Sequence, residues 1–409
     1  MSARRSVKHR DAWIIAVLLW FTTAGITAFE LVPASVLSVV VEDLGVTQTS
    51  VSWLVSVFIL GMATVAIPAG LLLDRHDNRV IILISTFAFL GTTLVTAYLS
   101  VRNSFQLLVL IRFLAGTLNV IIWTASVNIV GTTFVRTRQG TGIGFLSTSI
   151  PGGFALTHLL TPSLAEIISW EWTFAVYGGL TALAGLGFWV FTRPFDVRTN
   201  VEVPSREDFM TVLQNRYVWG IGVLAFAAFS LNMFFNNWLP TYLVAEHQFS
   251  LTQSGAFAAV FPAIGMVARM VSGSISDRLL GGRRKPIVIG SFVVIAPIIV
   301  AIPLIGTVVL LLVALVIAGF VTQMGVALLL PYVREVVETE VAGTALSVLN
   351  LVGFLGAFSA PIVTGVLIEA AGGYGTAFAY ATVLAVFGIG LSWLIPDVGP
   401  GRDMIEAEG

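Results

Sequence analysis

The sequence predicts an all-helical membrane protein in which about twelve membrane-spanning helices form two bundles of six. Three observations support this prediction. Hydrophobic residues make up 57% of the 409 residues and charged residues only 11%, against roughly 25% charged residues in an average soluble domain. Apolar stretches of about 20 residues recur along the chain, each long enough as a helix to cross a hydrocarbon core of roughly 30 Å. A motif of the first half returns 203 residues later in the second half.

The composition also excludes several classes of protein. So low a share of charged residues excludes a soluble enzyme, a disordered chain and a nucleic-acid-binding protein. The 21 basic and 22 acidic residues nearly cancel, so the chain as a whole does not attract nucleic acid. The absence of cysteine excludes disulfides, thiolate metal ligands and cysteine nucleophiles. The first apolar stretch is too long for a cleaved signal peptide and is expected to be a span.

The expected spans follow one another with short polar connections, and the 39 glycines are frequent inside them, as is typical of closely packed membrane helices. The longest polar stretch, 193–216, contains Ser205-Arg206-Glu207-Asp208, which resembles a helix capping box. We therefore expect a six-helix bundle over 1–193, a cytoplasmic linker with a short surface helix over 194–216, and a second six-helix bundle with a short tail over 217–409. The expected spans are 12–41, 49–73, 80–99, 104–131, 140–165, 172–192, 217–245, 251–276, 286–303, 306–331, 341–368 and 374–395.

Basic residues are distributed unevenly between the connections. Of the 21 lysines and arginines, 18 lie in the two tails and in alternate connections, whereas the connections on the other side hold only Arg102. By the positive-inside rule, the side with the basic residues is the cytoplasmic side. Both termini are therefore expected in the cytoplasm, and the protein is expected to be a multi-pass protein of the cell membrane.

The repeated motif lies where the second and eighth spans end. Glycine at a membrane exit lets two helices approach closely, and an Asp-Arg pair can bridge an interface that closes in one conformation and opens in another. We interpret the motif as a gate. The alternative is that its charged side chains only extend to the membrane surface. The expected gate residues are Gly70, Asp74, Arg75, Arg79, Gly273, Asp277, Arg278 and Arg283.

With these motifs, the sequence resembles the major facilitator superfamily. Residues 70–79, GLLLDRHDNR, are similar to the family loop G-x-x-x-D-R-x-G-R-R, except that Asp77 replaces the glycine and Asn78 a residue that is often basic. Residues 273–284, GSISDRLLGGRR, form a second copy with one extra residue, and residues 112–116 match the family pattern R-x-x-Q-G without its glutamine. The resemblance covers about 12–395 and implies the major facilitator fold. It also implies a secondary active transporter whose halves expose a central site alternately to each side.

Three ionisable residues lie well inside the expected spans, where each costs at least ~2.5–3.5 kcal/mol and is a functional candidate by default. Glu30 lies about 16 Å and Arg112 about 12 Å of helix from the outer ends of the first and fourth spans. Burial favours a neutral carboxyl and a nearby arginine favours a charged one, so we expect Glu30 to take up and release a proton as Arg112 moves. The alternative is a permanent structural ion pair. The arrangement resembles proton-coupled organic-anion symporters, which also carry an acid further along the fourth helix, where Asn119 is the nearest polar residue here.

Arg269, the third residue, is expected about 12 Å above the cytoplasmic end of the eighth span. Its surroundings resemble the eighth helix of nitrate/nitrite porters and oxalate:formate exchangers, in which an arginine at this place holds the anion. A guanidinium is a charged fork suited to a carboxylate or oxyanion. The second span lacks the arginine of nitrate porters and the eleventh lacks the lysine of oxalate exchangers, so we expect one monovalent anion or one carboxylate. The alternative is an arginine that braces a neighbouring helix or reaches the membrane surface.

Uncharged polar residues inside the spans complete the candidate site. Asn232, Trp238 and two further asparagines cluster on the seventh span beside Pro240. Each polar residue is either a substrate contact or a helix–helix hydrogen bond, and His158 is either a proton carrier or a packed histidine. The expected substrate-binding residues are Arg269, Asn236, Asn237, Tyr242, Gln323 and Asn350, and the expected proton-coupling residues are Glu30, Arg112 and His158.

The sequence therefore predicts proton-coupled uptake of a small anion such as a carboxylate. An anion exchanger, an efflux pump for amphipathic compounds and a non-transporting receptor or sensor that reuses the fold remain alternatives. An enzyme is not expected, because only one acid and one histidine lie inside the spans, and no G-x-x-x-x-G-K-[ST] loop for ATP occurs. We expect no catalytic residue, cofactor, metal or nucleic acid, and a monomer in the lipid bilayer that binds a small anionic substrate and protons.

Overall fold

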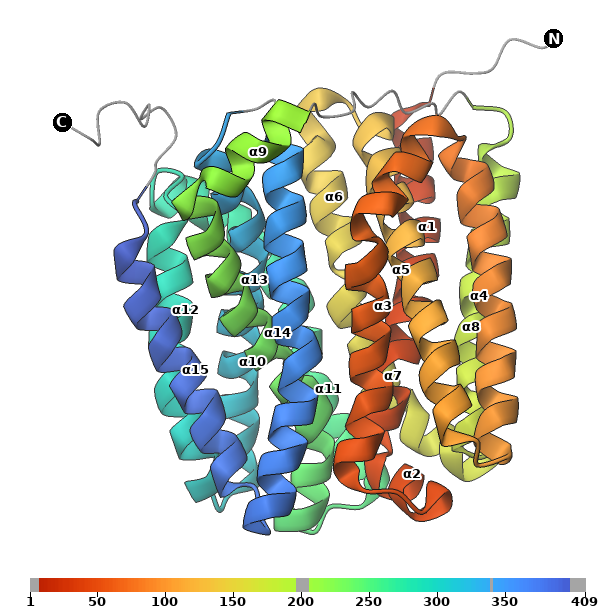
Figure 1. Cartoon of the computed structure of the whole chain (residues 1–409), viewed down its shortest axis with the longest axis vertical. Helices are drawn as coiled ribbons and strands as arrows, with labels where there is room; N and C mark the ends of the chain where they lie inside the picture. The colour runs from red at the N-terminus through yellow and green to blue at the C-terminus, as the bar shows by residue number, and fades with distance from the viewer. Residues whose placement is uncertain (1–6, 196–205, 339–340, 398–409) are drawn as a thin grey trace. The chain divides into compact units, whose positions relative to one another are not determined.

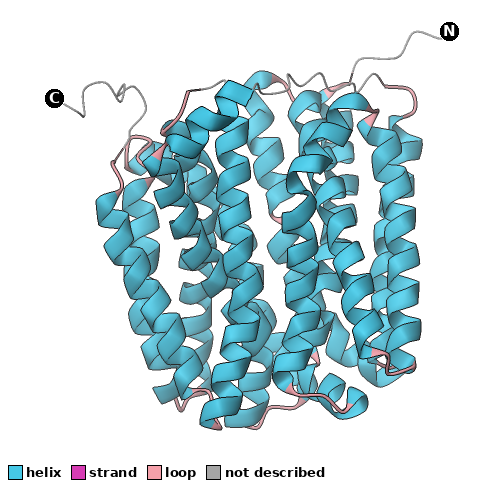
Figure 2. Cartoon of the chain, viewed as in Figure 1, coloured by secondary structure: helices cyan, strands magenta, loops and turns pink. Residues whose placement is uncertain are grey.

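The computed structural model describes residues 7–195, 206–338 and 341–397, whose regular elements are helices and two short 3-10 helices (Figures 1 and 2). Twelve helices of this described part are long and apolar enough to cross a membrane, which confirms the predicted all-helical membrane fold. That both termini lie in the cytoplasm stays a prediction.

Contacts group the chain into two compact units. Unit 1 comprises Met1–Val203 and Leu243–Ala259. Its described part contains eight complete α-helices, which form the six predicted spans, and one 3-10 helix between the fourth and fifth spans. These are α1 (His9–Ser35), α2 (Leu37–Leu44), α3 (Gln48–Arg75), α4 (Asn78–Val101), α5 (Phe105–Thr133), η1 (Arg136–Arg138), α6 (Gln139–Ser147), α7 (Ser149–Ile168) and α8 (Trp170–Thr192).

Unit 2 comprises Pro204–Tyr242 and Val260–Gly409. Two long helices, α10 (Arg216–His247) and α11 (Leu251–Leu279), run from one unit into the other, whereas we expected both to lie in the second bundle. The predicted domain limits stay a prediction. The remaining helices are α9 (Arg206–Gln214), α12 (Lys285–Ala301), η2 (Ile302–Leu304), α13 (Val308–Glu335), α14 (Ala342–Ala371) and α15 (Gly375–Leu394).

Two predicted spans are interrupted helices. The first leaves helical geometry at Val36, with φ −128° and ψ 36°, so the short helix α2 follows α1. The fifth consists of α6 and α7, separated at Thr148. Pro151 explains this second interruption, because it has no N–H to donate to the carbonyl of Ser147. The predicted linker helix corresponds to α9, whereas Ser205 of the proposed capping box lies outside the described residues.

The sequence repeat extends to helix packing. In unit 1, Gly116 of α5 lies against the main-chain oxygen of Phe58 in α3, so close that a Cβ would overlap with it. In unit 2, Gly319 of α13 lies in the same way against the main-chain oxygen of Phe261 in α11. Both residues of the second contact follow those of the first by 203 positions. Each unit therefore contains its own close helix crossing, made possible by glycine at the same place in each repeat.

Candidate functional site

Arg112 joins three helices in the interior of unit 1. Its side chain on α5 is completely buried. Nη2 donates a hydrogen bond of 2.6 Å to the main-chain oxygen of Glu30 in α1, and Nε donates to the main-chain oxygen of Leu54 in α3. The guanidinium carbon lies 4.8 Å from the ring centre of Phe29 and 5.5 Å from that of Phe174. Carbonyl oxygens and aromatic faces thus replace water around this charge.

Glu30 meets Arg112 through its main chain. Its side chain is buried, with 3% of the residue surface exposed. In residues 7–195, however, no ion pair joins the two side chains, and Nη1 of Arg112 has no hydrogen-bond partner there. The structure brings the two predicted residues together but leaves the carboxyl outside the hydrogen bonds of the guanidinium.

The close crossing of α3 and α5 explains how Arg112 of α5 reaches the main chain of α3. Gly116 follows Arg112 by one helical turn and lies on the Phe58 main chain, while Gly61 of α3 lies on the Phe113 main chain. Without side chains at these glycines, the two backbones come near enough for the arginine to bond to a carbonyl of α3. Two turns beyond Arg112, Asn119 Nδ2 lies 3.3 Å from Met62 Sδ.

His158 lies on a different helix from Glu30 and Arg112. It is completely buried on α7, and its main-chain oxygen faces Gly255 at the start of α11, within unit 1. Its part in proton coupling stays a prediction.

A chain of side-chain hydrogen bonds crosses the interior of unit 2. Arg269 Nε on α11 donates to Gln323 Oε1 on α13 at 2.8 Å, and Gln323 Nε2 donates to Asn232 Oδ1 on α10 at 2.8 Å. Asn236 Nδ2 donates to the same Asn232 Oδ1 at 3.1 Å and to the Asn232 main-chain oxygen at 2.8 Å. We call Arg269, Gln323, Asn232 and Asn236 the amide network. It brings together three predicted substrate-binding residues from three helices.

Asn232 is absent from the predicted binding residues although it is the centre of the amide network. Its spacing of four residues from Asn236 is the signal that could have identified it, since residues four apart lie on one helix face. Gly265 of α11 contributes in another way. A Cβ at this position would meet the Gln323 side chain at 2.5 Å, so the glycine provides the space in which Gln323 lies.

The other predicted binding residues lie outside the amide network. Asn237 follows Asn236 and so points about 100° further around α10. It is completely buried, and both side-chain polar atoms lack a hydrogen-bond partner in the described part of the chain. Asn350 is half-buried on α14. Tyr242 donates a long hydrogen bond of 3.4 Å to the main-chain oxygen of Ile302.

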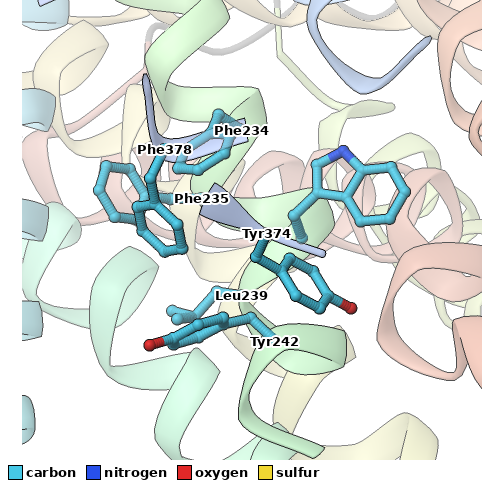
Figure 3. A pocket seen from close by; sticks show the side chains of 7 residues that line it. Phe234, Phe235, Leu239, Tyr242, Tyr374 and Phe378 are labelled. Carbon is cyan, nitrogen blue, oxygen red and sulfur yellow. The ribbon is translucent and has the colours of Figure 1, made fainter. Parts of the chain in front are cut away.

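Tyr242 also lines an aromatic pocket inside unit 2. Figure 3 shows the hydroxyls of Tyr242 and Tyr374 pointing in opposite directions. None of the lining side chains is charged, so the pocket offers no counter-charge to an anion. The lining residues are Phe234, Phe235, Trp238, Leu239 and Tyr242 from α10, with Tyr374 and Phe378 at the start of α15.

The first motif copy binds a helix end within unit 1. Arg79 is buried at 6% exposure and pairs with Asp77 at 2.6 Å. Its Nη1 donates to the main-chain oxygens of Thr192 and Phe195 at 3.2 and 3.1 Å, which are carbonyls at the end of α8. Arg75 is exposed and Gly70 half-buried, while the side chain of Asp74 lies outside what the structure describes. Arg79 is thus a positively charged cap on a helix C-terminus.

In unit 2, the second copy and the lysine that follows it form ion pairs and a comparable contact with a helix end. Lys285 Nζ donates to the main-chain oxygen of Ile395 at 2.6 Å, at the end of α15, 203 residues after Thr192. Arg284 bonds to Asp277 at 2.7 Å and to Glu335 at 3.0 Å. Arg283 pairs with Asp397 at 3.0 Å, whereas Arg278 is exposed and Gly273 half-buried. The gate function of the two motif copies stays a prediction.

Comparisons with known proteins agree with this architecture. The chain is 23% identical to a probable L-galactonate transporter of Escherichia coli (strain K12), over 90% of this chain and 85% of that protein. It is 24% identical to a probable galactarate/D-glucarate transporter of Bacillus subtilis (strain 168), over 96% and 93%, and 26% identical to a probable nitrate/nitrite antiporter of Thermus thermophilus, over 65% and 62%.

A solved structure shares the fold. It is the inward-facing, unoccupied form of a bacterial homolog of the human lysosomal transporter Spinster, with a TM-score of 0.77 at 15% identity, over 95% of this chain and 97% of that chain. The predicted transporter class and multi-pass membrane location are confirmed. The sequence model of the Major Facilitator Superfamily matches residues 13–361, and the chain therefore belongs to this family.

Proposed function

We propose that this transporter takes up a small hydroxylated carboxylate together with protons. The observation that supports the proposal most strongly is the amide network of unit 2, in which a membrane-embedded arginine lies beside three side-chain amides. A guanidinium at this depth needs a strong reason to be there, and a substrate carboxylate supplies one.

Arg269 is the proposed carboxylate ligand. A guanidinium has five N–H donors in a planar fork, and Arg269 Nε donates one of them to Gln323 Oε1. This bond fixes the plane of the fork, so that a bound carboxylate would meet a preset geometry. Two of the relatives are named as transporters of acid sugars, which are carboxylates with several hydroxyls. Their names support this substrate class over an amphipathic drug.

Glu30 is the proposed proton carrier, and Arg112 is its partner. When the carboxyl is neutral, Arg112 keeps its bonds to the main chain of α1 and α3. When the proton leaves, the carboxylate attracts the unpartnered Nη1 of Arg112, and the charge is balanced within unit 1. Protonation would therefore change contacts at the crossing of α1, α3 and α5. This is the local event through which a proton gradient could act on the transport cycle.

Uptake into proteoliposomes tests both parts. Purified protein is reconstituted, and uptake of radiolabelled D-galactonate, D-glucarate and nitrate is measured with and without an inward proton gradient. We expect uphill uptake of a hydroxylated carboxylate only with the gradient. Arg269→Ala should abolish uptake, whereas Arg102→Ala, at an exposed arginine, should leave it unchanged.

The proton part has its own pair of variants. Glu30→Gln should lose uphill uptake while keeping exchange of substrate across the membrane, because a neutral amide cannot carry a proton. Glu42→Gln, at an exposed acid, is the matched control. Uphill uptake by Glu30→Gln would rule out Glu30 as the coupling group. Gradient-independent exchange by the unaltered protein would favour an exchanger, and export of a cationic amphipathic compound alone would favour an efflux pump.

A further inference from the structure

We infer that Asn232 and Asn236, one turn apart on α10, recognise a hydroxyl group of the substrate. The inference deepens the proposed function and rests on it, since it takes the ligand to be a carboxylate held at Arg269. It assigns to the two asparagines the choice between a hydroxylated acid and an acid or oxyanion without hydroxyls.

The amide orientations in the network follow from the arginine. A guanidinium only donates hydrogen bonds, so the Gln323 atom facing Arg269 Nε is the acceptor Oε1. The Gln323 amide nitrogen must then face Asn232, whose Oδ1 accepts from it. The same Oδ1 also accepts from Asn236 Nδ2. Reversal of any one amide would place two acceptors or two donors against each other.

This fixed order leaves one donor and one acceptor unused, one helical turn apart. Asn232 Nδ2 forms no hydrogen bond among the described residues, and Asn232 keeps 6% of its surface exposed. Asn236 is buried at 1% exposure, and its Oδ1 has no hydrogen-bond partner in the same part of the chain. A buried acceptor without a partner is costly. A ligand that donates a hydrogen bond to it therefore removes this cost.

A hydroxyl group has the complementary chemistry. It carries one donor and two acceptor positions, so a single hydroxyl, or two on neighbouring carbons, can accept from Asn232 Nδ2 and donate to Asn236 Oδ1. A carboxylate or a nitrate ion only accepts and leaves Asn236 Oδ1 unsatisfied. The pair therefore favours an acid that carries hydroxyls over a simple fatty acid or an inorganic oxyanion. Sites that hydrogen-bond a substrate hydroxyl discriminate strongly against analogues without it.

Ser230 provides a matched control on the same helix. Its buried Oγ also lacks a hydrogen-bond partner among the described residues. It precedes Asn232 by two residues and Asn236 by six, which places it on the opposite face of α10 at 100° per residue. If the asparagine variants act only because a buried polar group has been removed from α10, Ser230→Ala should lower the preference for a hydroxylated acid as well. If they act through hydroxyl recognition, Ser230→Ala should leave this preference unchanged.

The test compares two six-carbon acids on the full-length protein in detergent. Isothermal titration calorimetry gives the Kd of D-gluconate and of hexanoate, which lacks hydroxyls, and the ratio of the two values is the readout. We expect the unaltered protein to favour gluconate by at least about tenfold. Asn236→Leu removes the acceptor and Asn232→Asp replaces the donor, and each should lower this preference about fivefold, as the loss of one net hydrogen bond predicts. Ser230→Ala should keep it.

The ratio is taken within each variant, so a general loss of folded protein affects both acids alike. Preference for gluconate that survives in both asparagine variants would overturn the inference while leaving the proposed function intact. Failure of the unaltered protein to bind either acid would overturn the proposed function and this inference with it. A preference lost in Asn236→Leu and Asn232→Asp but kept in Ser230→Ala would establish the hydroxyl-recognition pair.

Discussion

Two arginines inside the spans of this chain, Arg112 and the half-buried Arg269, have different surroundings. Arg112 bonds to main-chain oxygens of two neighbouring helices and lies over aromatic rings. Arg269 bonds to a side-chain amide that is itself held by another amide. Main-chain oxygens cannot turn away without bending a helix, so the bonds of Arg112 tie the backbones of two helices to α5. The side-chain bonds of Arg269 and Gln323 connect three helices without involving a main-chain atom.

Arg112→Lys tests the structural part of this contrast. Lysine keeps the charge, but its single ammonium cannot reproduce a planar fork that spans two helices. We expect a loss of about 1.5–3 kcal/mol in the free energy of unfolding, the usual value for a hydrogen bond to a charged group. Thermal unfolding followed by tryptophan fluorescence measures the change. A lysine variant as stable as the unaltered protein would show that the main-chain contacts contribute little.

Arg284 leads to a prediction on pH. Burial alone would lower its pKa, but the hydrogen bonds and charges of Glu335 and Asp277 raise the pKa of the guanidinium above its usual value. A group whose pKa is raised by folding stabilises the fold at low pH and loses this contribution only as pH rises through the raised pKa. We therefore expect Arg284→Gln to cost about 1–3 kcal/mol. The difference from the unaltered protein should be constant between about pH 7 and pH 9, because both values lie below the pKa of a guanidinium. A difference that shrinks over this range, measured by thermal unfolding, would contradict the assignment.

At the scale of helices, the close crossings depend on single glycines. A Cβ at Gly116 would overlap the main chain of Phe58, and one at Gly319 the main chain of Phe261, and backbone cannot yield as a flexible side chain can. Gly116→Ala and Gly319→Ala should each destabilise the protein by about 1–3 kcal/mol, as overpacking does. Gly91→Ala is the matched control.

Gly91 lies in α4, where a Cβ added to it would have no atom within 4 Å. Alanine is a better helix former than glycine by about 1 kcal/mol, so Gly91→Ala should be neutral or stabilising. Thermal unfolding of the three variants side by side separates the crossing from the general effect of glycine in a helix. Equal stability of all three would show that the helices move apart at little cost.

The two basic residues that bond to helix ends allow a paired experiment, with one variant in each unit. Arg79 holds the end of α8 and Lys285 holds the end of α15. We expect Arg79→Ala to raise hydrogen exchange at the end of α8 without affecting α15, and Lys285→Ala to do the reverse, because local opening follows the loss of local bonds. Exchange measured by mass spectrometry on both variants tests this. A change at both helix ends in either variant would indicate a coupling that these contacts do not explain.

The helices were largely predictable because their cause is local. Each expected span has a helical counterpart in the structure, and the ends of 49–73 and α3 differ by at most two residues. Hydrophobic length against membrane thickness determines such a span from sequence alone. The break at Thr148 could have been inferred from Pro151, whereas the break at Val36 has no local signal. The extra residue of the second motif copy falls in a turn where Gly281 and Gly282 have positive φ, which glycine alone adopts easily.

The candidate site was only partly predictable, because depth in a span is a local property and the direction of a side chain is not. The depths of Glu30 and Arg112 indicated that they could meet, and they do. That the contact runs through the main-chain oxygen of Glu30 depends on how α1 and α5 pack against each other, which the depth of the two residues does not determine. Likewise, Asn236 and Asn237 are adjacent residues of the same type on the same predicted span, yet only Asn236 joins the amide network. Helix rotation, set by packing of the whole unit, decides between them.

At the scale of the molecule, α10 and α11 are the helices that pass from one unit to the other. The passage lies between Tyr242 and Leu243 in α10 and between Ala259 and Val260 in α11. Each helix contains a proline within three residues of this point, Pro240 and Pro262. A proline inside a helix removes one main-chain hydrogen bond and permits bending there. Alternating access, which the family resemblance implies, requires two halves that move relative to each other, so we expect both helices to bend or pivot near these prolines.

Pro262→Ala therefore should stiffen α11 where bending is needed. Alanine restores the hydrogen bond to the main-chain oxygen of Ala258 and favours a straight helix. The four residues of the amide network are unchanged, so substrate Kd should stay within about twofold. Turnover in proteoliposomes should fall about three- to tenfold, which corresponds to roughly 0.7–1.4 kcal/mol in the barrier.

Pro297→Ala, in a helix that lies wholly in unit 2, is the control and should keep the turnover of the unaltered protein. An unchanged turnover of Pro262→Ala would place the bending elsewhere, whereas an equal loss in both variants would point to a general effect of helix prolines.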